Sequence, residues 1–204
     1  MDESVLIRTR SALHGAAELL VAGPQYAASA DIRLRVTPGG FGTATLPDLR
    51  IDGVDLVAGD RRVPLAGTYA DIAAAAGVVC RDLLDVYQGG IKVAETDAVD
   101  VDADAARLLA DAFARGDAAL RSFAPDAEVV LWPEHFDIGI TVDEVNYGVS
   151  PGDGFLAAPY AYVGPWTTRE GEFWNGPFGA ARPMSELPDA AAVEAFFREG
   201  RDRL

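Results

Sequence analysis

Cysteine, lysine and histidine are scarce in this sequence, and their scarcity removes several kinds of chemistry. Among 204 residues there are one cysteine, Cys80, one lysine, Lys92, and two histidines, His14 and His135. A single cysteine excludes an intramolecular disulfide and a cysteine-based zinc cluster, so we expect a reducing, cytoplasmic setting. No segment approaches the roughly 18 apolar residues that a membrane span needs. The acidic, interrupted start MDESVLIRTR is unlike a signal peptide.

The chain is acidic, with a formal net charge of -15. Its basic residues are nearly all arginines, and they are scattered along the sequence instead of forming a patch. Nucleic-acid phosphates and anionic lipids repel such a surface. We therefore expect neither nucleic acid nor a membrane as a partner. The composition, 50% hydrophobic and 24% charged, is that of an ordinary globular protein, and it specifies no cofactor and no oligomeric state.

Hydrophobic periodicity predicts helices over 4–22, from Thr68 on through 78–87, over about 102–123 and over about 189–202. Gly23-Pro24 is expected to stop the first helix. Asp52-Gly53 is expected to form a type I′ turn between two strands, with Arg50 opposite Asp55. Further short strands are predicted in the last third, at EVVLW, FDIGITV, EVNYGVS, YAYVGPW and EFW.

These elements predict an α+β fold, with a largely antiparallel sheet of hairpins and about four helices packed on it. We expect a single domain over 1–204. A β-meander and helices would occupy 1–124, and aromatic-rich hairpins with a closing helix would occupy 125–204.

The stretch NYGVSPGDG contains Gly148-x-Ser150-x-Gly152, the spacing of a hydrolase nucleophile elbow. An elbow needs a helix after the serine, and the N–H of the next residue for its oxyanion hole. Here that residue is Pro151, which has no N–H, and a turn and a strand are expected to follow. Both histidines precede Ser150, whereas an elbow enzyme places its histidine after the serine. The sequence therefore argues against a catalytic Ser150.

Three other motifs fail in a similar way. The acids Asp100, Asp102, Asp104 and Asp111 fit positions of a calcium loop, but the glycine needed at its sharp turn is an alanine. A helix N-terminus capped by carboxylates is the simpler interpretation. GGFGT, residues 39–43, lacks the rest of a phosphate-binding motif and is interpreted as a glycine-rich turn. Cys80 is placed on a helix as a small apolar residue, with a thiolate nucleophile as the alternative.

The segment LWPEHFDIGI is the remaining candidate for catalysis. Glu134, His135 and Asp137 place three acid/base groups within four residues at the start of a strand. Histidine titrates near neutrality, and a neighbouring carboxylate can orient it. No metal site is predicted, because no spacing matches a metal template. The alternative is that Glu134 and His135 are loop residues after Pro133, beside packed aromatic side chains.

The hairpin over 136–150 predicts a polar surface. With Asp143-Glu144 as its turn, Ile138, Ile140 and Val142 face the apolar partners Val149, Tyr147 and Val145. The other face then carries Thr141 opposite Asn146, Gly139 opposite Gly148, and Asp137 opposite Ser150. Paired glycines leave bare backbone, which often marks close approach by a ligand or by another part of the chain. Both alternatives stay open: a groove for a small molecule, or a gap filled by a helix or by Trp132.

We expect the groove to be edged by aromatic side chains, as small-molecule sites commonly are. The predicted ligand-binding residues are Glu134, Gly139, Thr141, Asn146, Gly148, Ser150, Asp153, Tyr160 and Tyr162. Tyr160 and Tyr162 would share a face of the strand that follows the hairpin.

The segments LWPEHFDIGI, NYGVSPGDG and PYAYVGPW resemble an uncharacterised bacterial family of unknown function. The family has similar Trp-Pro-x-His-Phe-Asp, Asn-x-Gly-x-Ser-x-Gly-Asp and Pro-Tyr-x-Tyr segments. LHGAAELLVAGPQ and RVTPGGFGT also resemble its N-terminal parts. The matching positions are Trp132, Pro133, His135, Phe136, Asp137, Asn146, Gly148, Ser150, Gly152, Asp153, Tyr160 and Tyr162. The resemblance implies where a site would lie and brings no activity with it.

Three hypotheses follow from the sequence. The leading one is a protein that binds a small molecule in the groove of the C-terminal hairpins. The second is an enzyme of hydrolase or isomerase type, in which His135 acts as the acid or base and Asp137 orients it. The third is a structural or protein-interaction domain with no pocket at the glycines.

Overall fold

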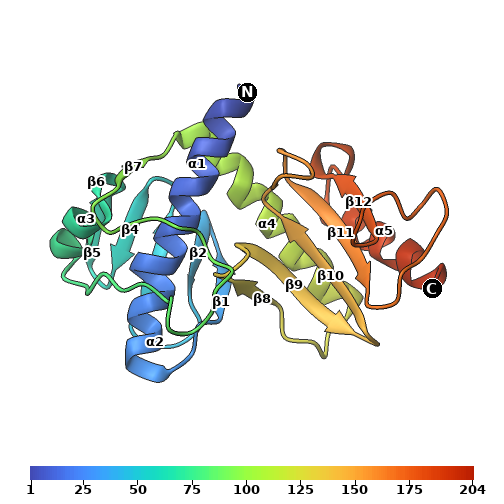
Figure 1. The fold of residues 1–204 in the computed structure, drawn as a ribbon, viewed down its shortest axis with the longest axis horizontal. Helices are drawn as coiled ribbons and strands as arrows, with labels where there is room; N and C mark the ends of the chain where they lie inside the picture. Colours follow the sequence, from blue (N-terminus) through green and yellow to red (C-terminus); the bar gives the residue numbers. More distant parts are fainter. The chain divides into compact units, whose positions relative to one another are not determined.

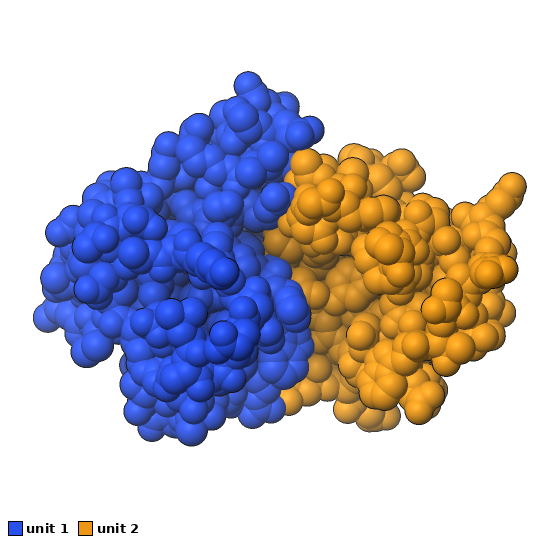
Figure 2. All heavy atoms as spheres, in the orientation of Figure 1, with its two compact units in different colours: residues 1–111, 131–136 blue, residues 112–130, 137–204 orange.

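The computed structural model describes residues 1–204, which divide into two compact units (Figures 1 and 2). Unit 1 comprises Met1–Asp111 and Leu131–Phe136, and unit 2 comprises Ala112–Val130 and Asp137–Leu204. The helices are α1 (Glu3–Ala16), the π-helical η1 (Ala17–Ala22), α2 (Gly23–Ser29), α3 (Tyr69–Ala76), α4 (Ala103–Phe123), the 3-10 helix η2 (Met184–Glu186) and α5 (Ala190–Asp202).

Antiparallel pairing dominates both units. In unit 1 the strands follow the order β8 (Val130–Trp132), β1 (Leu34–Thr37), β2 (Gly40–Thr43), β3 (Leu49–Asp52), β4 (Asp55–Ala58) and β5 (Arg61–Pro64). A separate pair consists of β6 (Ala66–Thr68) and β7 (Ala98–Asp100). In unit 2 the order is β12 (Ala180–Pro183), β11 (Tyr160–Pro165), β10 (Val145–Ser150) and β9 (Asp137–Val142). The predicted α+β fold with a largely antiparallel sheet is confirmed, and the single domain stays a prediction.

The first helix does not stop at Gly23-Pro24 as predicted. It passes through the π-helical turn η1 and continues as α2 to Ser29. In this turn the N–H of Gly23 donates to the carbonyl of Glu18, five residues back. Pro24 has no N–H to give the next carbonyl, that of Leu19, and the N–H of Arg81 donates to it instead at 3.1 Å. The wide turn therefore accommodates the proline. The carbonyl of Leu19, which has no partner within the helix, accepts its hydrogen bond from a residue far along the chain.

The hairpin of β3 and β4 does not have the predicted register: its turn lies one residue later, and each residue of β3 pairs two residues further along β4. Asp52 pairs with Asp55 and Ile51 with Leu56, so Gly53-Val54 forms the turn. Gly53 has φ +62, which suits the first central position of a type II′ turn. Arg62 of β5 reaches Asp52 at 2.5 Å and Asp55 at 2.7 Å, so the two facing carboxylates share one cation. The predicted pair of Arg50 with Asp55 is wrong.

The helix α3 begins at the predicted cap but ends before 78–87. Thr68 and Asp71 form a reciprocal capping box, and Gly77 ends the helix in the left-handed conformation. Residues 78–87 then contain neither helix nor strand, with a turn at 84–86, so Cys80 is not on a helix. GGFGT is also more than a turn, because residues 40–43 form the buried strand β2.

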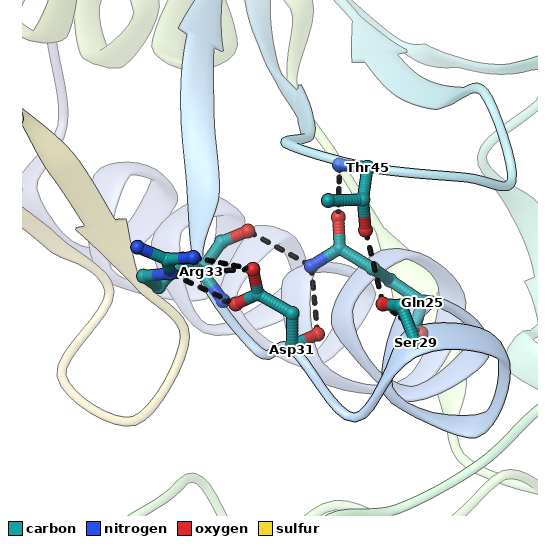
Figure 3. A network of polar contacts seen from close by, with 5 residues as sticks. All are labelled: Gln25, Ser29, Asp31, Arg33 and Thr45. Carbon is teal, nitrogen blue, oxygen red and sulfur yellow. Dashed lines mark hydrogen bonds and ion pairs between the residues drawn. The ribbon is translucent and has the colours of Figure 1, made fainter.

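A polar network joins α2 to the strands of unit 1 (Figure 3). The side chain of Gln25, which is fully buried, donates to the carbonyls of Asp31 and Arg33 at 2.8 Å each and accepts from the N–H of Thr45 at 2.9 Å. Asp31 in turn holds the guanidinium of Arg33, with its Nη2 at 2.8 Å. The amide of Gln25 thus satisfies backbone groups before β1 and after β2, and it fixes the loop before β3.

In unit 2, helices cover one face of the strands. A Cβ at Gly116 of α4 would come within 2.5 Å of Val149, and one at Gly200 of α5 within 2.8 Å of Val163, so both helices lie directly on the strands. Phe197 of α5 is fully buried, as predicted for the closing helix. The predicted strand at EFW is wrong: Trp174 closes a turn onto Gly171, and β12 is the strand that follows β11. Across the whole chain, no helix is both long enough and apolar enough to span a membrane.

Candidate functional site

The hairpin of β9 and β10 has the predicted register. Val142 pairs with Val145, Thr141 with Asn146, and Gly139 with Gly148. Asp143 and Glu144 have φ +51 and +62, which are the two positive values that a two-residue type I′ turn requires. The residues therefore sort onto the two faces of the strands as the alternation predicts.

The helices α4 and α5 cover one of these faces. The other face is turned away from the two helices, and we call it the polar face. Ile138, Val149 and Val163 point toward the helices. Since side chains alternate along a strand, the polar face carries nine of the predicted site residues: Asp137, Gly139, Thr141, Asn146, Gly148, Ser150, Tyr160 and Tyr162, with Asp153 in the loop that follows β10.

Tyr162 fills the gap over the two glycines. It pairs with Gly148 on β10, which in turn pairs with Gly139 on β9. A Cβ at Gly148 would stand 2.4 Å from the Tyr162 hydroxyl, and one at Gly139 would stand 3.0 Å from it. The phenol therefore lies across two strands in the space that side chains would occupy. Of the two alternatives, the gap filled by the chain itself is the one observed, and the side chain that fills it is Tyr162 instead of a helix or Trp132.

The Tyr162 hydroxyl ends at Asp137, donating to Oδ2 at 2.5 Å. Burial, followed by the charge and hydrogen bond of Asp137, raises the pKa of Tyr162 well above its usual value. The phenol therefore stays protonated at neutral pH and acts as a donor, not as a base. Asp137 fixes the ring against the sheet, while Tyr162 remains half-buried and so keeps part of its surface open to solvent.

A second tyrosine–aspartate pair lies beside the first. Tyr160 donates to Oδ2 of Asp153 at 2.6 Å, while Oδ1 of Asp153 accepts the N–H groups of Phe155 and Leu156. Burial first, and then the hydrogen bond with Asp153, raise the pKa of Tyr160. Asp153 therefore organises its own loop as well as Tyr160. Phe178 contacts both tyrosines, stacked on Tyr160 at 6.0 Å and edge-on to Tyr162 at 6.2 Å between ring centroids.

Ser150 serves the backbone of the same loop. Its Oγ accepts the N–H of Gly152 at 3.1 Å, and no helix follows in residues 151–159. The helix that a nucleophile elbow needs after its serine is therefore absent.

At the other end of the polar face, three side chains meet at Asn146. Its Oδ1 accepts the hydroxyl of Thr141 at 2.8 Å and the indole N–H of Trp166 at 3.4 Å. Trp166 is 65% exposed. The polar face therefore has an exposed aromatic residue beside Asn146, which the sequence did not predict.

Glu134 and His135 belong to unit 1, where they form a pair of their own. They lie in the turn that the N–H of Phe136 closes onto the carbonyl of Trp132. His135 is exposed, and its Nε2 stands 3.9 Å from Oε2 of Glu134. Glu134 also lies against Gly89, where a Cβ would come within 2.4 Å of its carboxylate.

The sequence analysis missed a buried cluster around His14. The Nε2 of His14 lies 2.8 Å from the carbonyl of Pro133 and 3.5 Å from Oε1 of Glu18, and its ring stacks on Phe136. Glu18, 4% exposed, accepts the N–H of Ile91 at 3.0 Å. The available signal was the spacing of four between histidine and glutamate on a helix. The cluster fastens the 78–97 segment to η1.

The other motifs have structural roles. Asp102 caps α4 by accepting the N–H groups of Asp104 and Ala105, as the simpler interpretation predicted. Burial, with Glu95 and Asp82 adding to it, raises the pKa of the Cys80 thiol to about 11, which opposes thiolate formation. No group of three or more histidine, cysteine, aspartate or glutamate side chains is arranged to hold a metal ion.

Comparison of the chain with protein-family models, with curated proteins and with solved structures found no match. The polar face offers a fixed aromatic ring, a carboxylate at the end of that ring and polar groups further along the same strands.

Proposed function

We propose that unit 2 binds a small molecule on its polar face, with the ring of Tyr162 as the platform. The observation that carries the proposal is the hydrogen bond of 2.5 Å from the Tyr162 hydroxyl to Asp137, which crosses β10 at Gly148. A side chain fixed in this way loses little further freedom when a ligand arrives. The proposal also agrees with the rule that a few placed polar groups around apolar surface make a ligand site.

The neighbouring groups supply further contacts. Thr141 and Asn146 are exposed on the same face, two residues along from the glycine pair. Two residues of a strand span about 7 Å, so a molecule the size of a sugar or an amino acid could touch the ring and the amide together. Trp166 would then flank the ligand from the side of Asn146.

The test is a ligand screen followed by amide chemical-shift mapping. Binding should shift the amides of Thr141, Asn146 and Tyr162, and Tyr162→Leu should weaken it by at least about tenfold, the size of one lost contact of 1.4 kcal/mol. Asp202→Asn on α5 should leave the affinity unchanged. A ligand whose binding survives Tyr162→Leu, or a broad screen with no shift on this face, would refute the proposal.

An enzyme remains the second candidate, because the exposed His135 ring has a carboxylate partner. That partner is Glu134, at 3.9 Å, whereas Asp137 accepts a short hydrogen bond from the hydroxyl of Tyr162. The acid/base pair would then be His135 with Glu134. Turnover lost in His135→Ala and Glu134→Gln, with ligand affinity retained, would favour this function over simple binding.

A further inference from the structure

The arginines of unit 2 lie mostly on its helix side, where several of them pair with carboxylates of the same helices. Six of its seven arginines lie on or against the helices: Arg115 and Arg121 on α4, Arg198, Arg201 and Arg203 on α5, and Arg182 beside Glu199 of α5. On the helix side, burial raises the pKa of Tyr147, the guanidinium of Arg201 opposes that rise, and Asp143 adds to it. On the polar face, the groups acting on Tyr162 are Asp137 and Tyr160.

The polar face is thus negative. Asp137 stands at the hydroxyl end of Tyr162, Asp153 lies beside Tyr160, and Asp143 and Glu144 form the turn beyond Asn146. Ionised carboxylates accept hydrogen bonds and donate none, so the carboxylates of this face favour a ligand that brings donors or positive charge. An anionic ligand would be repelled here.

The ring of Tyr162 has the same preference. Aromatic faces carry negative potential and attract ammonium groups within about 6 Å of the ring centroid. A hydroxyl that donates to a carboxylate makes its ring richer in electrons, which strengthens that attraction. The ring extends over Gly139 and Gly148 and stays partly exposed, so part of it is open to a ligand.

From this geometry we infer that the ligand of the polar face is a small organic cation, a substituted or quaternary ammonium compound. Its ammonium group would lie over the ring of Tyr162 with Asp137 as the counter-charge. This inference rests on the proposed function and adds the ligand class to it.

The experiment compares a cation with a neutral molecule of the same shape. Choline carries a trimethylammonium group, and 3,3-dimethylbutan-1-ol carries an uncharged tert-butyl group of the same shape in its place. Each is titrated by calorimetry and amide chemical-shift mapping into the full chain, with neutral and acidic metabolites as further arms. Choline should bind at least tenfold more tightly than the alcohol, and its affinity should fall when salt is raised from about 0.1 M to 1 M, because screening then reaches down to about 3 Å.

Two variants give the control. Asp137→Asn, which keeps the shape of the side chain, should weaken choline at least tenfold, while Asp202→Asn on α5 should leave it unchanged. If the alcohol or a neutral metabolite binds as well as choline, and the same amides shift, the ligand class is overturned and the binding function stands. If nothing binds to the polar face, both fail. Equal losses in both variants would show a general effect of charge and would overturn the proposed role of Asp137.

Discussion

Tyr162 and Asp137 lie on strands that are not neighbours, yet the hydroxyl of Tyr162 donates to Oδ2 of Asp137 at 2.5 Å. The side chain reaches β9 from β11 by crossing β10 at Gly148. Glycine is needed there because any Cβ would stand where the phenol lies. An aromatic side chain that covers glycine in a sheet is a known way to restore packing lost with the missing side chain. The pair therefore explains two glycines and one tyrosine together.

Gly148→Ala should destabilise the fold. The added methyl would come 2.3 Å from the carbonyl of Ile138 and 2.4 Å from the Tyr162 hydroxyl. Because one of these neighbours is backbone, the strand itself must move, and the loss should be about 2 kcal/mol or more in urea unfolding. Gly154→Ala is the control, since a Cβ there meets nothing within 4 Å. Equal stabilities for the two variants would contradict the packing described here.

Glu144→Gly should stabilise the protein. Glu144 has φ +62 in the turn of the β9–β10 hairpin, and the left-handed conformation costs a residue with a side chain roughly 1–2 kcal/mol. Glycine adopts it freely, and its greater freedom in the unfolded chain offsets part of the gain. We expect a net gain of about 1 kcal/mol, a rise in Tm of roughly 2–4 °C at this chain length.

The matched variant for this turn is Glu144→Gln. It removes the same charge and keeps the side chain in the left-handed conformation. If Glu144→Gln raises Tm as much as Glu144→Gly does, charge repulsion at the turn is the cause, and the backbone explanation is wrong.

The sequence predicted the β9–β10 hairpin because its signal is local. Apolar and polar residues alternate on both strands, and a slip of one residue would turn Ile138, Ile140 and Tyr147 to the wrong face. In the hairpin at Asp52 the alternation does not select a single register. Apolar residues sit at Ile51, Val54 and Leu56, so two registers looked acceptable, and the choice depended on Arg62 of the next strand.

What the sequence could not supply were partners brought from far along the chain. The π-helical turn before Pro24 depends on the N–H of Arg81 meeting the carbonyl of Leu19. The sequence showed the gap at Gly139 and Gly148, but the side chain that fills it, Tyr162, comes from β11 and not from the hairpin itself. Periodicity describes which face a residue takes, and it carries no information on how far a side chain then reaches over that face.

Cys80 should react slowly with thiol reagents in the native protein. Its pKa is raised to about 11 from the ordinary value of 9.0, with burial as the first cause. This rise in the pKa of Cys80 lowers the thiolate fraction at neutral pH by about 100-fold, and the thiolate is the nucleophile. Alkylation by iodoacetamide at pH 7.5 should therefore be about 100-fold slower in the native protein than in urea. Similar rates in the two states would show that the thiol is not held in this environment.

Asp31→Asn should change the dependence of stability on acid pH. The hydrogen bond from the side chain of Arg33 is the main cause that lowers the pKa of Asp31 in the folded state. A lowered pKa contributes stability that is present above the unfolded value of about 3.9 and is lost as pH falls through the folded pKa. Wild type should therefore be more stable than Asp31→Asn at pH 7, and the two curves of unfolding free energy should converge below about pH 4. Asp126→Asn, at an exposed loop residue of unit 2, is the control. A constant difference between wild type and Asp31→Asn from pH 7 to pH 2.5 would show that the carboxylate charge does not stabilise the fold.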